Sequence, residues 1–165
     1  SIFNAASEKY NDWCNIVKLN TTERPTVMLG LPWKDSWNMA GGNSFTAKLI
    51  DDAGGNYLWS HTKSDEYLPL AIESVIETSL NADYWLNTGS ARSLDDVTGR
   101  DKRYESFKSW KTNSLYNNDM QYNGESNNFW EKGVVEPHII LRDMIKIFHP
   151  EMVPNDEFVY YRRLE

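Results

Sequence analysis

The chain has 165 residues, of which 40% are hydrophobic, and a formal net charge of −7. This length suits one ordinary domain with a sizeable core and is too short for two. The acidic balance excludes nucleic acid as an expected partner, because phosphate contacts need clustered basic residues and the longest cluster here is Arg162–Arg163. The single cysteine, Cys14, excludes a disulfide framework and a zinc ligand set, and we expect it to be a small core hydrophobe.

The beginning of the chain reads as the end of a longer helix. Residues 1–19 place apolar side chains at helical spacing, including Tyr10, Trp13 and Val17. No capping signal precedes them, and the chain starts at Ser1 rather than at a methionine, so we expect a processed or partial chain that lacks an upstream portion. No secretory signal opens the sequence, and no apolar run approaches the ~18 residues that a membrane span needs.

Strand and helix patterns alternate along the rest of the chain. Short apolar, β-rich runs indicate strands, and apolar residues at three-to-four spacing indicate helices. Gly54-Gly55 ends one such helix, and Ser93 with Asp96 three residues later forms a capping-type start for another. The expected strands are residues 26–31, 37–40, 57–59, 83–88 and 114–116, and the expected helices cover residues 43–53, 69–80, 93–110 and 137–148.

The order of these patterns predicts the fold class. Alternating strands and helices require crossover connections, and these produce a mostly parallel sheet with helices on both faces. The predicted fold is therefore three-layer α/β. Residues 61–66 and 117–128 are polar loops, and the second is long enough to be functional or mobile. The aromatic tail at residues 158–161 is expected to pack on the body.

Groups that could carry catalysis do not converge in the sequence. His61, His138 and His149 are too dispersed to form a metal site, and His149 suits a helix end. There is no P-loop, no dinucleotide-binding glycine fingerprint and no GxSxG motif. Paired carboxylates such as Asp51-Asp52 lie at helix ends, where capping and solvation explain them. We therefore expect no enzymatic activity, no metal site and no cofactor.

One edge of the predicted sheet could bind a ligand. In an open α/β sheet, ligands lie beyond the carboxyl ends of the strands. Flat aromatic rings there offer stacking area, while cationic side chains and a helix N-terminus could hold an anionic or carbonyl-rich group. Each residue alone suits ordinary packing or solvation at least as well, and only the shared edge makes a site. The candidate ligand contacts are Trp33, Lys34, Trp37, Asn43, Ser44, Arg92 and Trp130.

A resemblance to a known family covers nearly the whole chain. It rests on the segments PTVMLGLPW, GGNSFTAKLIDDAGGNYLW, LPLAIESVIETSLNADYWLN and GVVEPHIILRDMIKIFHPE. Their order and spacing resemble the C-terminal lobe of the helical-hinge periplasmic substrate-binding proteins of ABC importers. This branch of the family captures ferric siderophores, haem and cobalamin, and the sequence is most similar to iron-transport binding lipoproteins of the Bacteroidetes type. The family joins two α/β lobes by one long helix and holds the ligand between them.

The resemblance implies a division of the chain and a set of roles. Residues 1–19 correspond to the end of the connecting helix, residues 20–165 to the C-terminal ligand-binding lobe, and the N-terminal lobe is missing. Glu73 matches an exposed glutamate that docks onto arginines of the permease, with a solvated helix face near the positive helix start as the alternative. The cleft positions correspond to Trp33, Trp37, Asn43, Ser44 and Trp130.

The implied function is capture of an iron chelate or a corrinoid and its delivery to an ABC permease in the inner membrane. The implied location is the periplasm, with a lipoprotein anchor in the missing N-terminal region. If an intact protein bound its ligand with about 8 kcal/mol and the lobes shared this equally, one lobe would keep roughly 4 kcal/mol, which corresponds to millimolar affinity.

Two alternatives remain open: a glycan-binding module, since tryptophans and asparagine-rich loops suit sugar stacking, and the non-catalytic half of a larger enzyme. Neighbouring permease and ATPase genes would support transport, whereas a neighbouring glycosidase would support glycan binding.

Overall fold

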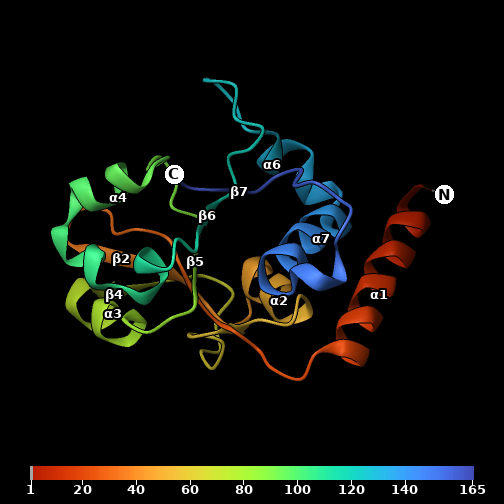
Figure 1. The fold of residues 1–165 in the computed structure, drawn as a ribbon, viewed down its shortest axis with the longest axis horizontal. Helices are drawn as coiled ribbons and strands as arrows, with labels where there is room; N and C mark the ends of the chain where they lie inside the picture. The colour runs from red at the N-terminus through yellow and green to blue at the C-terminus, as the bar shows by residue number, and fades with distance from the viewer. Residues whose placement is uncertain (1) are drawn as a thin grey trace.

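The centre of the computed structural model, which describes residues 2–165 and side chains from residue 4 onward, is a five-stranded sheet (Figure 1). Its strand order is β3-β1-β5-β6-β7. The first four strands run parallel, and β7 is antiparallel to β6. A separate two-stranded antiparallel sheet consists of β2 and β4, and we call it the β2–β4 sheet. The strands are β1 Thr26–Leu29, β2 Ser36–Ala40, β3 Asn56–Tyr57, β4 Tyr67–Ala71, β5 Tyr84–Leu86, β6 Leu115–Asn117 and β7 Arg162–Arg163.

Helices cover both faces of this sheet, which confirms the predicted three-layer α/β architecture. In Figure 1, α1, α2 and α7 lie on one side, while α3, α4 and the β2–β4 sheet lie on the other. The α-helices are α1 Ile2–Asn20, α2 Phe45–Asp52, α3 Ile72–Ser79, α4 Leu94–Arg100, α5 Lys108–Lys111, α6 Asn128–Glu131 and α7 Pro137–Phe148, and the 3-10 helices are η1 Lys102–Ser106, η2 Gly133–Val135 and η3 Pro150–Met152.

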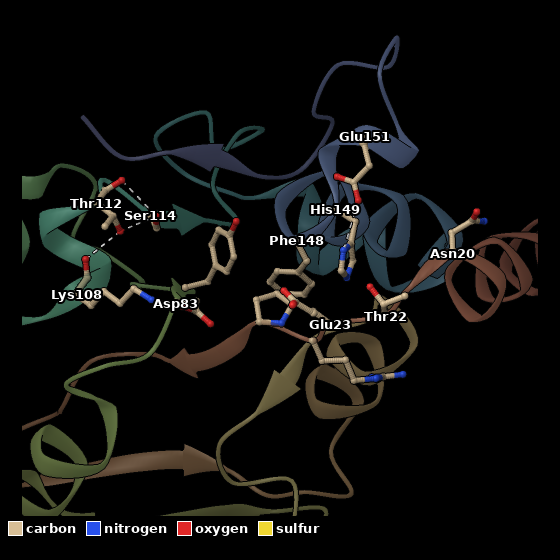
Figure 2. Close-up of a pocket in the computed structure, with 13 residues that line it drawn as sticks. Asn20, Thr22, Glu23, Asp83, Lys108, Thr112, Ser114, Phe148, His149 and Glu151 are labelled. Atoms are coloured by element: carbon tan, nitrogen blue, oxygen red, sulfur yellow. Dashed lines mark hydrogen bonds and ion pairs between the residues drawn. The ribbon is translucent and has the colours of Figure 1, made fainter.

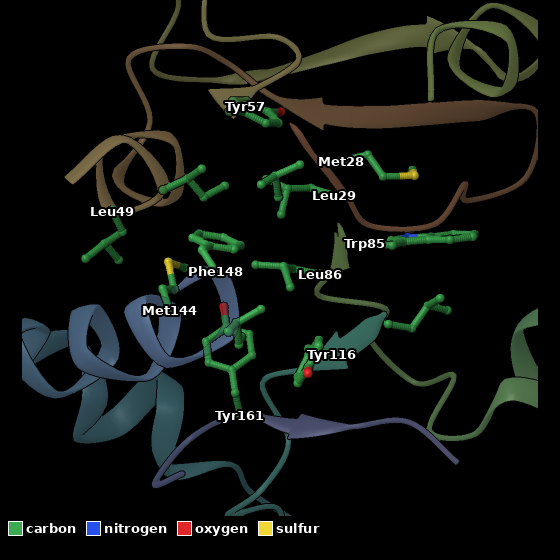
Figure 3. Close-up of a cluster of buried hydrophobic side chains, with 14 of the residues drawn as sticks. Met28, Leu29, Leu49, Tyr57, Trp85, Leu86, Tyr116, Met144, Phe148 and Tyr161 are labelled. Atoms are coloured by element: carbon green, nitrogen blue, oxygen red, sulfur yellow. The ribbon is translucent and has the colours of Figure 1, made fainter. Parts of the chain in front are cut away.

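Strand alternation divides the core into two halves. Register pairs Met28 with Trp85 and Leu29 with Leu86, so each pair faces the same side of the sheet. Trp85 faces the side of the β2–β4 sheet, where its ring centroid lies 5.0 Å from that of Phe107. Leu86 faces the other side, where Figure 3 places it beside Phe148 of α7. These core side chains are at most 5% exposed, so the sheet is buried on both faces, as parallel sheets require.

Several sequence predictions need correction. The expected helix over residues 69–80 begins only at Ile72, because residues 67–71 pair with β2 as strand β4. The expected helix over residues 93–110 is broken into α4, η1 and α5. Its predicted cap is confirmed, since Asp96 donates its backbone N–H to Ser93 Oγ at 3.0 Å. The break follows from Asp101, whose side chain accepts from the Arg103 N–H and starts a new helix.

The first helix matches its prediction from residue 2 onward, and Ser1 lies outside the described residues. α1 packs on α7, as Figure 1 shows at the edge of the molecule. Cys14 is half-buried at the margin of the core and is not one of its fully buried residues. Within residues 2–165, no helix combines the length and the apolar character that crossing a membrane needs.

Candidate functional site

A cavity of about 430 Å³ opens at the carboxyl ends of the parallel strands, and we call it the strand-end cavity. Leu29 ends β1, Asn87 follows β5 and Asn118 follows β6, so neighbouring strands of the sheet deliver these residues to one place. This is the edge at which open α/β sheets bind ligands. The lining residues are Leu29, Gly30, Asn38, Ala40, Thr46, Tyr67, Asn87, Gly89, Arg92, Asn118, Asp119, Tyr122, Glu125, Ser126, Asn127 and Trp130.

A stacked guanidinium group forms the charged part of this wall. The guanidinium carbon of Arg92 lies 3.7 Å from the ring centroid of Tyr122, close enough for a cation–π contact. Arg92 Nε is 3.5 Å from Asp119 Oδ2. Asp119 also receives two hydrogen bonds from Arg162, at 2.7 Å to Oδ1 and 3.0 Å to Oδ2. Two guanidinium groups therefore share one carboxylate, and the three groups together carry one net positive charge.

The polar loop over residues 117–128 forms another part of the wall. Asn127 Nδ2 donates to the backbone carbonyl of Asn118 at 2.8 Å, and Asn127 Oδ1 accepts from the Phe129 N–H at the start of α6. Asn123 Oδ1 accepts from the N–H groups of two residues that follow it. Local asparagine bonds of this kind replace the missing strand and helix bonds, and so they hold a loop that has little apolar content.

The structure brings two of the predicted ligand contacts to the cavity, Arg92 and Trp130. Trp130 is 59% exposed and stands against the buried ring of Phe129, with the ring centroids 4.8 Å apart. An exposed indole that is held by an edge-to-face contact with a buried ring offers a flat face for stacking.

The remaining predicted contacts lie away from the cavity lining. Trp33 and Lys34 belong to a tight turn in which Trp33 and Ser36 exchange two backbone hydrogen bonds. Ser44 caps α2, because its Oγ accepts from the Ala47 N–H at 3.2 Å. Asn43 is exposed, and its backbone N–H donates to the carbonyl of Ser64. Of the predicted ligand contacts, only Arg92 and Trp130 therefore line the cavity, and ligand binding by them stays a prediction.

Trp37 is a core residue and not a surface contact. Its side chain is fully buried and its indole N–H donates to the Leu29 carbonyl at 2.9 Å. Residues of a strand point alternately to its two faces, so burial of Trp37 and Met39 turns Asn38 outward to the cavity. Applied to residues 36–40, the same alternation could have identified Asn38 from the sequence.

Several polar residues of the cavity were not predicted. Asn87 and Asn118 come directly after short buried strands, and this position was the available signal. Asn87 adopts a left-handed backbone conformation with φ of 63°, which asparagine tolerates well. Its Oδ1 accepts a hydrogen bond from the Tyr161 hydroxyl at 2.8 Å. Burial raises the pKa of Tyr161, so this hydroxyl stays protonated and keeps donating.

A second hollow, of about 560 Å³, lies at the opposite edge of the sheet (Figure 2). Several of its polar groups bond within the protein: Lys108 Nζ lies 2.6 Å from Asp83 Oδ1, and the His149 ring bonds the Gly54 carbonyl at 3.0 Å. His149 directly follows α7, at the helix end where the sequence placed it. Since ligands of parallel sheets bind at the carboxyl edge, we take the strand-end cavity as the candidate site.

Metal-ligating groups do not gather at either hollow. Across the described part of the chain, no three His, Cys, Asp or Glu side chains lie close enough together to hold a metal ion.

Comparison with known proteins gives one sequence relative and several structural neighbours. No protein-family model matches the chain. An uncharacterized lipoprotein of Methanocaldococcus jannaschii is 24% identical over 147 residues, which is 87% of this chain and 34% of that protein. The chain thus spans about a third of the length of this relative.

Solved structures that resemble the chain include periplasmic solute-binding proteins. A periplasmic solute-binding protein of Veillonella parvula has a TM-score of 0.69 and 17% identity, over 93% of this chain and 45% of that one. The periplasmic heme-binding protein RhuT of Roseiflexus sp. RS-1 has a TM-score of 0.64 and 18% identity, over 89% and 54%. Helicobacter pylori CeuE with bound Ni(II) has a TM-score of 0.65 and 12% identity, over 92% and 46%. The chain therefore has the fold of a lobe of periplasmic solute-binding proteins.

Proposed function

We propose that the chain is the C-terminal lobe of the substrate-binding component of an ABC importer. In this proposal it captures an iron chelate (siderophore or haem) or a corrinoid in the periplasm and delivers it to a permease in the inner membrane. The observation that carries the proposal is the strand-end cavity, which combines an exposed indole, a stacked guanidinium group and asparagine amides at the ligand-binding edge of the sheet. Trp130 supplies area for a flat ligand, and Arg92 supplies charge.

A second lobe would complete the site. The chain spans about half the length of its solved neighbours. We assign residues 1–19 to the connecting helix and residues 20–165 to the C-terminal lobe. A largely apolar groove of about 910 Å³ between α1, α2 and α7, lined by residues such as Phe45 and Val135, supports the presence of further protein beside α1. A lipoprotein anchor ahead of the N-terminal lobe fits the lipoprotein relative.

Delivery requires a surface that the permease recognises, and we place it at the end of the β2–β4 sheet where β2 begins and β4 ends. Glu73 is exposed in the first turn of α3, two residues after Ala71. Ser36 pairs with Ala71 of β4, and it also forms an isolated β-bridge with Trp33. Trp33, which is 71% exposed, therefore lies at the same end as Glu73 and is better suited to a protein contact than to the cavity.

Replacing Glu73 with lysine tests the docking role. In the complete binding protein, Glu73→Lys is expected to lower uptake of radiolabelled ferric chelate about tenfold, because a lysine would repel the arginines of the permease. Ligand affinity should stay unchanged, since Glu73 does not line the cavity. The control is Glu151→Lys, the same charge change at the opposite edge of the sheet. Equal uptake by both variants would remove Glu73 from the docking surface.

Tryptophan fluorescence tests the ligand class. A ferric siderophore, haem or cobalamin should quench the complete protein saturably, with much weaker binding by this chain alone, and Trp130→Phe should remove part of the quenching. A glycan-binding role is the second candidate, because exposed Trp130 and Tyr67 stand beside asparagine amides that suit sugar hydroxyls. Saturation by an oligosaccharide in the same titration would favour that role and sink the transport proposal.

A further inference from the structure

Asn118 has an unused hydrogen-bond donor at the strand-end cavity. The residue is only 6% exposed and lines the cavity, yet its Nδ2 has no hydrogen-bond partner in the part of the chain that the structure describes. Buried polar groups are nearly always satisfied, and a buried donor without a partner lowers the stability of the fold. This Nδ2 atom is itself buried, so a rotation of the side chain must turn it toward the cavity before an acceptor on a ligand can reach it.

A second donor without a hydrogen bond lies on the wall of the strand-end cavity, in Arg92. Its Nε is buried without a hydrogen bond, and its nearest carboxylate oxygen, on Asp119, is 3.5 Å away. Arg162 already donates to both oxygens of Asp119, so that carboxylate is satisfied from outside the cavity. Arg92 therefore keeps unused donors, and the Tyr122 ring holds its guanidinium plane in place, while Glu125 adds a second carboxylate to the cavity lining.

We propose that Asn118 and Arg92 form a subsite for a carboxylate of the ligand. The Asn118 amide would donate one hydrogen bond and the Arg92 guanidinium the other, which matches the acceptors of a carboxylate. This inference rests on the proposed function and narrows it, because it selects carboxylate-bearing ligands over neutral chelates. In this proposal Asn118 is a ligand-binding residue that was not predicted from the sequence.

Citrate is the probe that tests the subsite on this chain. Titration of ¹⁵N-labelled protein with sodium citrate at constant ionic strength should shift the Asn118 side-chain amide and the Arg92 Nε–H signals saturably. Acetamide, a neutral probe, should not shift them. Asn118→Asp should weaken citrate binding at least tenfold, because it places a carboxylate against the ligand carboxylate. The matched control Asn128→Asp makes the same charge change at an exposed amide that bonds Gln121 outside the cavity lining.

Asn118→Leu separates a ligand role from a structural one. Leucine of similar volume removes the unsatisfied amide, so this variant should fold with unchanged or greater stability in urea denaturation while losing the citrate response. A variant that is destabilised yet binds citrate as tightly as the parent chain would overturn the inference. So would an absence of citrate shifts in the parent chain.

The failure of this inference and that of the proposed function give different results. If citrate binds at Asn118 but no iron chelate, haem or cobalamin binds the complete protein, the subsite stands and the transport proposal falls. If a chelate binds the complete protein and Asn118→Leu leaves its affinity unchanged, the transport proposal stands and the subsite falls.

Discussion

Replacing Trp85 with alanine is expected to lower the free energy of unfolding by about 3–5 kcal/mol. Trp85 is fully buried, and its ring lies among those of Trp37, Tyr104 and Phe107 at centroid distances of 6.1, 5.2 and 5.0 Å. Truncation would leave a cavity that three rigid rings cannot fill. It would also orphan the carbonyl of Gly30, which accepts the indole N–H at 2.7 Å.

Urea denaturation followed by far-UV circular dichroism measures this loss, because fluorescence would change with the number of tryptophans. Trp85→Phe should fall between the parent and the alanine variant, since it keeps a ring and loses only the bond to Gly30 and part of the buried area. Trp33→Ala is the control: Trp33 is 71% exposed, so its loss should change stability by no more than about 0.5 kcal/mol. Equal effects of Trp33→Ala and Trp85→Ala would contradict the packing described here.

Trp33 and Trp37 show which features of this fold can be predicted from the sequence and which cannot. The alternation of strands and helices was readable because each element repeats its own period along the chain. The buried and exposed faces of β2 were not predicted, because a five-residue strand in a two-stranded sheet gives only a weak alternation of apolar and polar residues. Trp37 was therefore assigned to the surface, although its neighbours Asn38 and Met39 alternate outward and inward as a half-buried strand requires.

The cavity wall was less predictable than the fold for a physical reason. Arg92 and Asn118 are 26 positions apart and meet only because β5 and β6 are neighbours in the sheet. The pairing of Asp119 with Arg162 depends on β7 returning antiparallel along β6, and a two-residue strand carries no period. Which donors stay unsatisfied follows from these three-dimensional contacts, so Asn118 emerges only from the structure.

One buried carboxylate, that of Asp143, holds the backbone of the segment before β7 in place. Its removal is the second large loss of stability that we expect. Asp143 is 1% exposed, and its Oδ2 accepts backbone N–H groups from Val159, Tyr160 and Tyr161 at 3.1, 2.6 and 3.0 Å. Asp143→Ala leaves these donors without an acceptor and should cost about 3–4 kcal/mol of unfolding free energy. Asp143→Asn should cost less, about 1–2 kcal/mol, because an amide oxygen in the Oδ2 position preserves the three bonds.

The pH dependence gives an independent check on the same carboxylate. Burial raises the pKa of Asp143 above its ordinary value, against the lowering effect of the backbone donors Tyr160, Tyr161 and Val159. The folded chain therefore holds this proton more tightly than the unfolded chain does. Between the ordinary aspartate pKa of about 3.9 and the raised folded value, stability contributed by this group falls as pH rises.

Urea denaturation of the parent chain and of Asp143→Asn across pH 4 to 7 measures this contribution as a difference, in which the other titrating groups cancel. The advantage of the parent chain over Asp143→Asn should shrink as pH rises through that window. Asp156→Ala, which removes an exposed carboxylate from the same tail, should show neither the stability loss nor the change in slope. Because the tail carries Arg162 to Asp119, Asp143→Ala should also weaken the citrate response of Arg92, whereas Asp156→Ala should preserve it. A parent advantage that grows with pH would mean that the three backbone donors, and not burial, dominate the Asp143 carboxylate.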